Sequence, residues 1–220
     1  IEKERTDEAD KVSARITEML LEKTFSFTPD FLLRIHQRLF EGIYKHAGAY
    51  RTVNISKKEW VLGGDTVVYS SYDMLRETLE YDFELEKRVD NNALNVDLAI
   101  KQICKFISGI WQIHPFREGN TRTTAVFTMK YLQTFGFTVN NDVFKDNSWY
   151  FRNALVRANY KNLPKGIHST SDYLELFFRN LILGEKNVLS NRSMLVFESQ
   201  STNNEFSKCQ NGSLDCSLDE

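Results

Sequence analysis

Residues 114–122 read His114-Pro115-Phe116-Arg117-Glu118-Gly119-Asn120-Thr121-Arg122. The residues before this stretch show an apolar stripe at helical spacing, made of Val96, Ile100, Ile103, Ile107 and Ile110. Pro115 and Gly119 break that periodicity, and a second helix is predicted to begin near Asn120 and to end at Gly136. The sequence therefore predicts a buried helix, a loop and a second helix, with reactive side chains gathered in the loop.

The start of the second helix has the features of an anion site. A helix N-terminus presents free backbone N–H groups, and Gly119 lets the backbone approach a ligand closely. Asn120 can cap the helix or contact a phosphate oxygen. Arg122 lies in the first turn, where a cation opposes the helix dipole, which indicates a ligand that brings negative charge.

Two further side chains of the loop supply acid–base and metal chemistry. Glu118 is a hard oxygen ligand, and Mg²⁺ in proteins is typically held by one or two carboxylates together with substrate phosphates. His114 has an ordinary pKa near 6.5, so it can accept the proton of a hydroxyl at neutral pH. Base, metal ligand and anion site together favour attack by a hydroxyl group on phosphorus.

Most of the remaining chain is predicted to be helical. Thr28-Pro29 opens a helix, and further helices are expected over about 147–160 and 171–183. Strand-forming residues on both sides of Gly63-Gly64-Asp65 predict a β-hairpin within 50–70. The expected fold is all-α with one β-hairpin. Its predicted parts are an N-terminal helix in 1–27, a catalytic domain in 28–184, a further helix in 185–198 and a polar, disordered tail in 199–220.

Composition excludes several classes of protein. The net charge of −2 gives no basic footprint for nucleic acid, and no apolar run approaches the length of a membrane helix. The charged start of the chain shows no signal peptide. The odd count of 3 cysteines, without a C-x-x-C spacing, predicts neither a disulfide framework nor a zinc site. A cytoplasmic protein is the expectation, with Cys104 in the core.

Residues 114–122 resemble the Fic family motif, H-P-F-x-[D/E]-G-N-[G/K]-R. Ala47-Gly48-Ala49-Tyr50-Arg51, followed by the hairpin, is similar to the family's A-G-x-[FY]-R lead into its flap. The resemblance implies a Fic-type helical domain that transfers AMP from ATP, with Mg²⁺ or Mn²⁺, to a Tyr, Thr or Ser hydroxyl of a protein. The acceptor could include the protein itself, and the flap would align the target by adding it as a strand.

The same resemblance assigns roles to single residues. It makes His114 the general base and Glu118 the metal ligand, and it places the ATP phosphates against Gly119, Asn120 and Arg122. Arg117, Thr121 and Thr123 are further candidates for phosphate contact, with a helix-start role as the alternative for the two threonines. Tyr150 or Asn153 would border the adenine, and Lys57 and Lys58 would lie on the target-docking flap.

Two positions depart from the family pattern. Thr121 stands where the family has Gly, or Lys in its Doc-like kinase branch, and Ala125 stands where AMP-transferring members have a second Arg that grips the γ-phosphate. Ser201–Glu205 matches the family's inhibitory signature only in part, because Phe206 follows. A Doc-like kinase, transfer of another phosphate-containing group and a non-catalytic toxin–antitoxin or regulatory module therefore stay open as alternatives.

Overall fold

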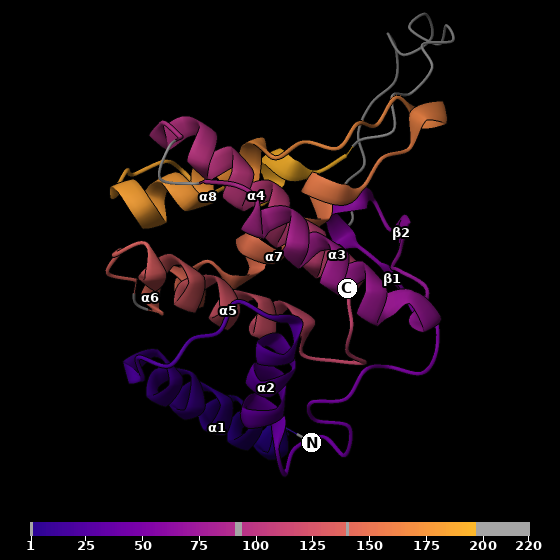
Figure 1. Ribbon diagram of the computed structural model, residues 1–220. Coiled ribbons are helices and arrows are strands. Elements are labelled where there is room, and N and C mark those ends of the chain that lie inside the picture. The colour runs from indigo at the N-terminus through magenta and orange to yellow at the C-terminus, as the bar shows by residue number, and fades with distance from the viewer. Residues whose placement is uncertain (1, 91–93, 140, 197–220) are drawn as a thin grey trace, which may run out of the picture.

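The computed structural model describes residues 2–90, 94–139 and 141–196, and within these ranges it is helical apart from one hairpin (Figure 1). The helices are α1 (Glu2–Leu21), α2 (Pro29–Phe40), α3 (Leu75–Lys87), α4 (Val96–Ile113), α5 (Asn120–Thr134), α6 (Asp142–Asp146), α7 (Ser148–Asn159) and α8 (Asp172–Leu183). Strands β1 (Ser56–Lys58) and β2 (Thr66–Val68) form a single antiparallel pair. The predicted all-α class with one hairpin is confirmed.

Helix α4 lies at the centre of the packing. It contacts α3, α5, α7 and α8, while α2 packs on α5, and α1 packs on both α2 and α5. In Figure 1, α1 and α2 lie at the bottom, α5 and α6 above them, and α4 and α8 at the top. The predicted apolar stripe of α4 is buried from Ile100 to Ile110, together with Cys104, as the helical spacing requires, whereas Val96 at the start of the helix is exposed.

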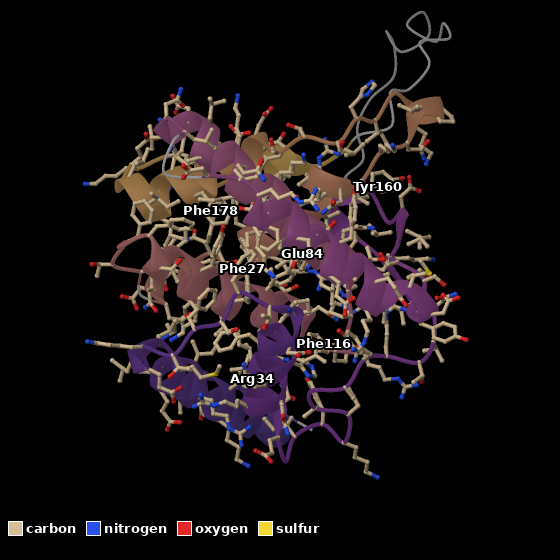
Figure 2. The ribbon with its side chains drawn as sticks, viewed as in Figure 1. Phe27, Arg34, Glu84, Phe116, Tyr160 and Phe178 are labelled. Atoms are coloured by element: carbon tan, nitrogen blue, oxygen red, sulfur yellow. The ribbon has the colours of Figure 1, made fainter. Side chains whose placement is uncertain are left out.

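Aromatic rings fill the space between these helices. The ring of Phe27, labelled in Figure 2, lies 4.9 Å from Phe83 of α3 and 5.4 Å from Phe106 of α4. Helix α3, which the sequence analysis did not anticipate, turns Leu75, Leu79 and Phe83 into this core. Within the described ranges, no helix is both long and apolar enough to span a bilayer.

Helices α2 and α4 begin at residues whose side chains cap them. Thr28 Oγ1 accepts a hydrogen bond from the N–H of Phe31, and Asn95 Oδ1 accepts one from Leu98. Helix α5 differs, because Gly119 at its N-cap position has no side chain to cap it. The first backbone N–H groups of α5 are thereby left for another acceptor.

Helix α1 is fixed over α5 by a buried cation. Lys130 of α5 donates from Nζ to the carbonyl of Met19 at 3.1 Å and also to the carbonyl of Glu22. Free carbonyls at a helix C-terminus favour such a cation. Arg15 adds a hydrogen bond of 2.9 Å to the carbonyl of Leu39 in α2. These bonds hold the second half of α1 against the helices that carry the candidate site.

The hairpin is shorter than predicted, and its base is tied to the motif loop. Ser56 pairs with Val68 and Lys58 with Thr66, and a 3₁₀ turn over Trp60–Leu62 connects the strands. Arg51 is buried and donates from Nε to the carbonyl of His114 at 2.8 Å. Because the same guanidinium also bonds the carbonyls of Val53 and Ser70, it clamps the two ends of the hairpin segment onto the loop.

The prediction of a helix over 185–198 is wrong for the residues that the structure describes. Helix α8 ends at Gly184 in the left-handed conformation, and only a 3₁₀ turn, Arg192–Met194, follows before residue 197. Asn180 exchanges hydrogen bonds with Asn187. Such side-chain bonds to nearby backbone compete with helix formation. The predicted tail, 199–220, and the partial signature at Ser201–Glu205 lie outside the described residues.

Candidate active site

His114 occupies an unusual backbone position at the end of α4. Its φ of 53° is the one positive value outside glycine among the residues that the structure describes. Its Nδ1 lies 3.1 Å from the carbonyl of Trp111, and its ring stacks on Tyr69 at 3.8 Å between centroids. A carbonyl can only accept, so Nδ1 carries the proton and Nε2 keeps a lone pair. That is the tautomer a general base needs.

The surroundings of His114 keep the ring neutral. Burial lowers its pKa to about 3, and the nearby charges of Lys57, Arg152 and Arg51 add to the effect. The hydrogen bond to the Trp111 carbonyl acts in the opposite direction but is outweighed. At pH 7 the imidazole is therefore available to accept a proton.

Asn120 closes the loop rather than presenting its side chain to a ligand. Its Oδ1 accepts from the N–H of Phe116 at 2.9 Å, and its Nδ2 donates to the carbonyl of Phe116 at 2.7 Å. Both polar groups of a buried amide are thus satisfied within the loop. The predicted phosphate contact at this position can come only from the backbone N–H.

His36 of α2 holds the loop from the other side, and the sequence analysis did not single it out. Its Nδ1 accepts from the N–H of Gly48 at 2.8 Å, so its Nε2 is the donor to the carbonyl of Glu118 at 3.0 Å. Its ring stacks on Phe116 at 3.8 Å, and Figure 2 labels Phe116 near α2. Burial lowers the pKa of His36 to about 4, which keeps this bridge neutral.

The start of α5 opens into a small pocket of about 140 Å³, the motif pocket, which lies between the loop, the hairpin and α7. It is lined by Lys57, His114, Glu118, Gly119, Asn120, Thr121, Arg122 and Arg152. Uncapped N–H groups at a helix N-terminus and three cationic side chains make it suitable for phosphate. Thr121 lines the pocket while its Oγ1 accepts from Trp111 Nε1 at 3.0 Å.

Glu118 is the acidic group of the motif pocket. Its side chain is 59% exposed, and Lys57 Nζ lies 3.5 Å from Oε2. No group of three metal-binding side chains occurs within the described ranges. Glu118 alone fits Mg²⁺ in the manner usual for nucleotide sites, with phosphate oxygens completing the coordination.

Arg122 is already engaged by the N-terminal helix. Its Nη1 donates to Glu8 Oε1 at 3.0 Å and its Nη2 to the hydroxyl of Tyr44 at 3.0 Å, while the guanidinium lies over the ring of Phe40. Tyr44 in turn donates to the same oxygen of Glu8 at 2.9 Å. A phosphate that binds Arg122 therefore competes with Glu8.

Two of the predicted phosphate contacts are not supported. Arg117 is exposed and does not line the motif pocket, because its neighbour Phe116 takes the inward position against His36. Thr123 is fully buried. It shares the core face of α5 with Asn120, Thr124 and Phe127, whereas Thr121 and Arg122 face the pocket.

The adenine side stays a prediction, and the structure shows only where its two residues lie. Tyr150 and Asn153 are buried on the core face of α7, where they bond the carbonyl of Tyr173 and the side chain of Asn191. The residue of α7 that lines the motif pocket is Arg152. On the hairpin, alternation turns Lys57 into the pocket and leaves Lys58 exposed.

Comparison with known protein families gives one decisive match. The family described as Fic/DOC matches residues 26–132, a range that spans α2, the hairpin, the motif loop and nearly all of α5. The chain carries a Fic/DOC domain. The resemblance of residues 114–122 to the Fic motif is thereby confirmed.

Similar proteins come from Bartonella. Protein adenylyltransferase VbhT of Bartonella schoenbuchensis is 27% identical over 116 residues, which cover 53% of this chain and 23% of VbhT. The chain thus spans less than a quarter of that relative.

Solved Fic structures share the fold. The N-terminal Fic domain of a putative cell filamentation protein from Bartonella quintana, crystallised with ADP, superposes with a TM-score of 0.67 at 18% identity and covers 82% of this chain and 85% of its own. BepC of Bartonella tribocorum, crystallised with AMPPNP, superposes with a TM-score of 0.64 at 18% identity. The match covers 82% of this chain and 86% of the BepC chain. At this identity the likeness establishes the fold of the Fic/DOC domain.

Proposed function

We propose that the Fic/DOC domain is a protein adenylyltransferase that moves AMP from ATP to a Tyr, Thr or Ser hydroxyl of a protein. One arrangement carries the proposal: a neutral His114, with the lone pair on Nε2, borders a pocket built from the free N-terminus of α5. VbhT is named a protein adenylyltransferase, and the two Bartonella structures hold ADP and AMPPNP, which supports a nucleotide in this pocket.

The chemistry follows from these groups. The target hydroxyl gives its proton to His114 Nε2 and its oxygen bonds the α-phosphorus, while the bond to the bridging oxygen breaks and pyrophosphate leaves. The N–H groups at the start of α5 stabilise the negative charge that develops on the α-phosphate oxygens. Glu118 would hold Mg²⁺, which neutralises phosphate charge when bound.

Double labelling tests the proposal directly. The full chain is incubated with Mg²⁺ and a candidate target, using ATP labelled either at the α- or at the γ-phosphorus. Protein-bound label from α-labelled ATP alone supports AMP transfer. Label from γ-labelled ATP alone would show a Doc-like kinase instead, and absence of both labels would favour the non-catalytic alternative.

We expect Glu118→Gln to raise the Mg²⁺ concentration needed for half-maximal transfer by at least tenfold. Glutamine keeps the shape of the side chain but loses the charge that a hard cation prefers. A Mg²⁺ titration of the transfer rate measures this. Glu84→Gln, an exposed carboxylate of α3 paired with Lys87, is the control. An unchanged Mg²⁺ requirement in Glu118→Gln would leave Glu118 with no role in metal binding.

We expect Glu8→Ala to tighten ATP binding about two- to fivefold, because it frees Arg122 for phosphate. The gain is small, since both partners are partly exposed and such pairs contribute little. Calorimetry with ATP measures the affinity. Asp10→Ala changes a carboxylate on the same helix that does not bond Arg122 in the described structure, and it should leave the affinity unchanged. Equal affinities in wild type and Glu8→Ala would show that Glu8 does not compete with the nucleotide.

A further inference from the structure

Arg152 faces the motif pocket from α7, on a different element from Arg122. It lines the pocket together with His114 and Glu118. The position comes from the helix period, because the buried residues Phe151 and Leu155 fix one face of α7 in the core. The guanidinium is thus carried on a packed helix rather than on a mobile loop.

A buried carboxylate holds this guanidinium in place. Arg152 Nη2 donates to Glu59 Oε1 at 2.6 Å, and the Glu59 side chain is only 2% exposed. The Arg152 side chain remains 26% exposed, and its Nη1 makes no hydrogen bond to the described residues. Its Nε is buried and has no hydrogen-bond partner in the described part of the chain. An arginine offers five N–H donors, so Glu59 leaves donors of Arg152 free for a second acceptor.

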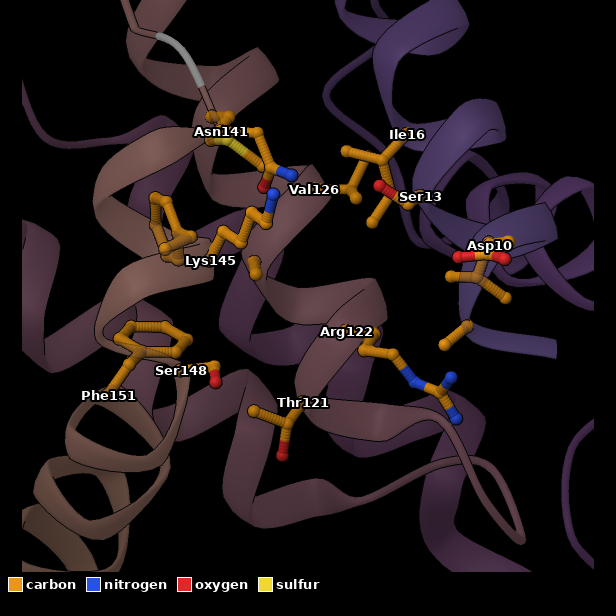
Figure 3. Close-up of a pocket in the computed structure, with 15 residues that line it drawn as sticks. Asp10, Ser13, Ile16, Thr121, Arg122, Val126, Asn141, Lys145, Ser148 and Phe151 are labelled. Atoms are coloured by element: carbon orange, nitrogen blue, oxygen red, sulfur yellow. The ribbon is translucent and has the colours of Figure 1, made fainter. Parts of the chain in front are cut away.

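Ala125, at the position where the family pattern has a second arginine, does not line the motif pocket. Ala125 lines a separate pocket of about 450 Å³, enclosed by α1, α5, α6 and α7, which Figure 3 shows in close-up. Thr121 and Arg122 line both pockets. Ala125 lines the larger pocket but not the motif pocket, whereas His114 and Glu118 line the motif pocket but not the larger one. The second guanidinium that borders the motif pocket therefore comes from α7 and not from α5.

We propose that Arg152 binds the phosphate chain of the donor nucleotide, and so supplies from α7 a phosphate contact that Ala125 cannot make. This rests on the proposed function only in that the ligand is a nucleoside polyphosphate. Arg152 acts with Arg122 on the same phosphates, and Glu59 is a positioning residue that presents the guanidinium. Arg152 also lies close enough to lower the pKa of His114, which fits a place beside the reacting groups.

Calorimetry on the full chain tests the assignment with three ligands: ATP, inorganic tripolyphosphate and adenosine. We expect Arg152→Gln to weaken ATP and tripolyphosphate alike, by at least tenfold, because charge-assisted contacts to phosphate are lost. Adenosine should be unaffected. Arg152→Lys should recover part of the loss, since it keeps the charge but not the fork of donors.

Two variants separate binding from a structural role of the ion pair. Arg152→Gln leaves Glu59 buried without its partner, which can prevent folding, so the double variant Arg152→Gln/Glu59→Gln is measured beside it. We expect the double variant to lose affinity as Arg152→Gln does, and Glu59→Gln alone to lose far less. Equal losses in Glu59→Gln and Arg152→Gln would overturn the proposal.

A matched control and a second readout complete the design. Arg179→Gln on α8 also removes a paired arginine, outside both pockets, and should leave every affinity unchanged. If Arg152→Gln weakens adenosine but not tripolyphosphate, Arg152 contacts the nucleoside and the assignment is wrong. If Arg152→Gln loses tripolyphosphate binding but the wild type transfers no AMP, the assignment of Arg152 stands and the proposed function is wrong. If the wild type transfers AMP but Arg152→Gln keeps its affinity for tripolyphosphate, the proposed function stands and the assignment is wrong.

Discussion

Replacing His114 with alanine is expected to slow AMP transfer by about 10²–10⁴-fold, the usual cost of losing a general base. The fold should survive, because alanine leaves in place the His114 carbonyl that accepts from Arg51. ATP affinity should change little, since the proposed phosphate site is formed by the N–H groups of α5 rather than by the ring. Single-turnover transfer rates, together with calorimetry for ATP, measure the two effects separately.

The dependence of the wild-type rate on pH checks the same role. Because burial lowers the pKa of His114 to about 3, the ring stays neutral as pH falls, and the transfer rate should not drop near pH 6.5. His168→Ala, at an exposed loop position outside the motif pocket, serves as the control. Wild-type transfer rates in His114→Ala would rule out the proposed mechanism.

Replacing Gly119 with alanine is expected to destabilise the fold and to disable the site together. Gly119 has a φ of 78°, and an added Cβ would lie 2.4 Å from Cε2 of Phe40 and 2.6 Å from its Cζ. The left-handed backbone costs about 1–2 kcal/mol for alanine, and overpacking adds about 1–3 kcal/mol. A loop displaced by about 1 Å can lose about 10²-fold in rate. Denaturant unfolding and transfer rates measure both effects.

Gly136→Ala separates the two causes. Its φ of 85° demands the same backbone conformation, but an added Cβ there would meet no described atom within 4 Å. The control should therefore lose only the backbone contribution, about 1–2 kcal/mol, and keep its transfer rate. Equal destabilisation by the two substitutions would mean that Phe40 yields to the new methyl group and that close packing at Gly119 is unimportant.

The local sequence determined the helices and the kind of chemistry. The stripe from Val96 to Ile110 predicted α4, and Thr28 and Gly136 marked the start of α2 and the end of α5, because caps and periodicity act over a few residues. The motif around His114 identified the family for the same reason, since base, acid and anion site are neighbours in the chain.

Only the tertiary structure decided which side chains reach the pocket. The packing of α7 on α8 buries Tyr150 and Asn153, the two residues expected to border the adenine, and turns Arg152 toward the motif pocket. His36 bonds the carbonyl of Glu118 in the loop, 82 residues away in the chain. Glu8 accepts a hydrogen bond from Arg122, 114 residues away, and Glu59 accepts one from Arg152, 93 residues away. Helix rotation and contacts over such separations depend on how whole elements pack, and no spacing within the motif records them.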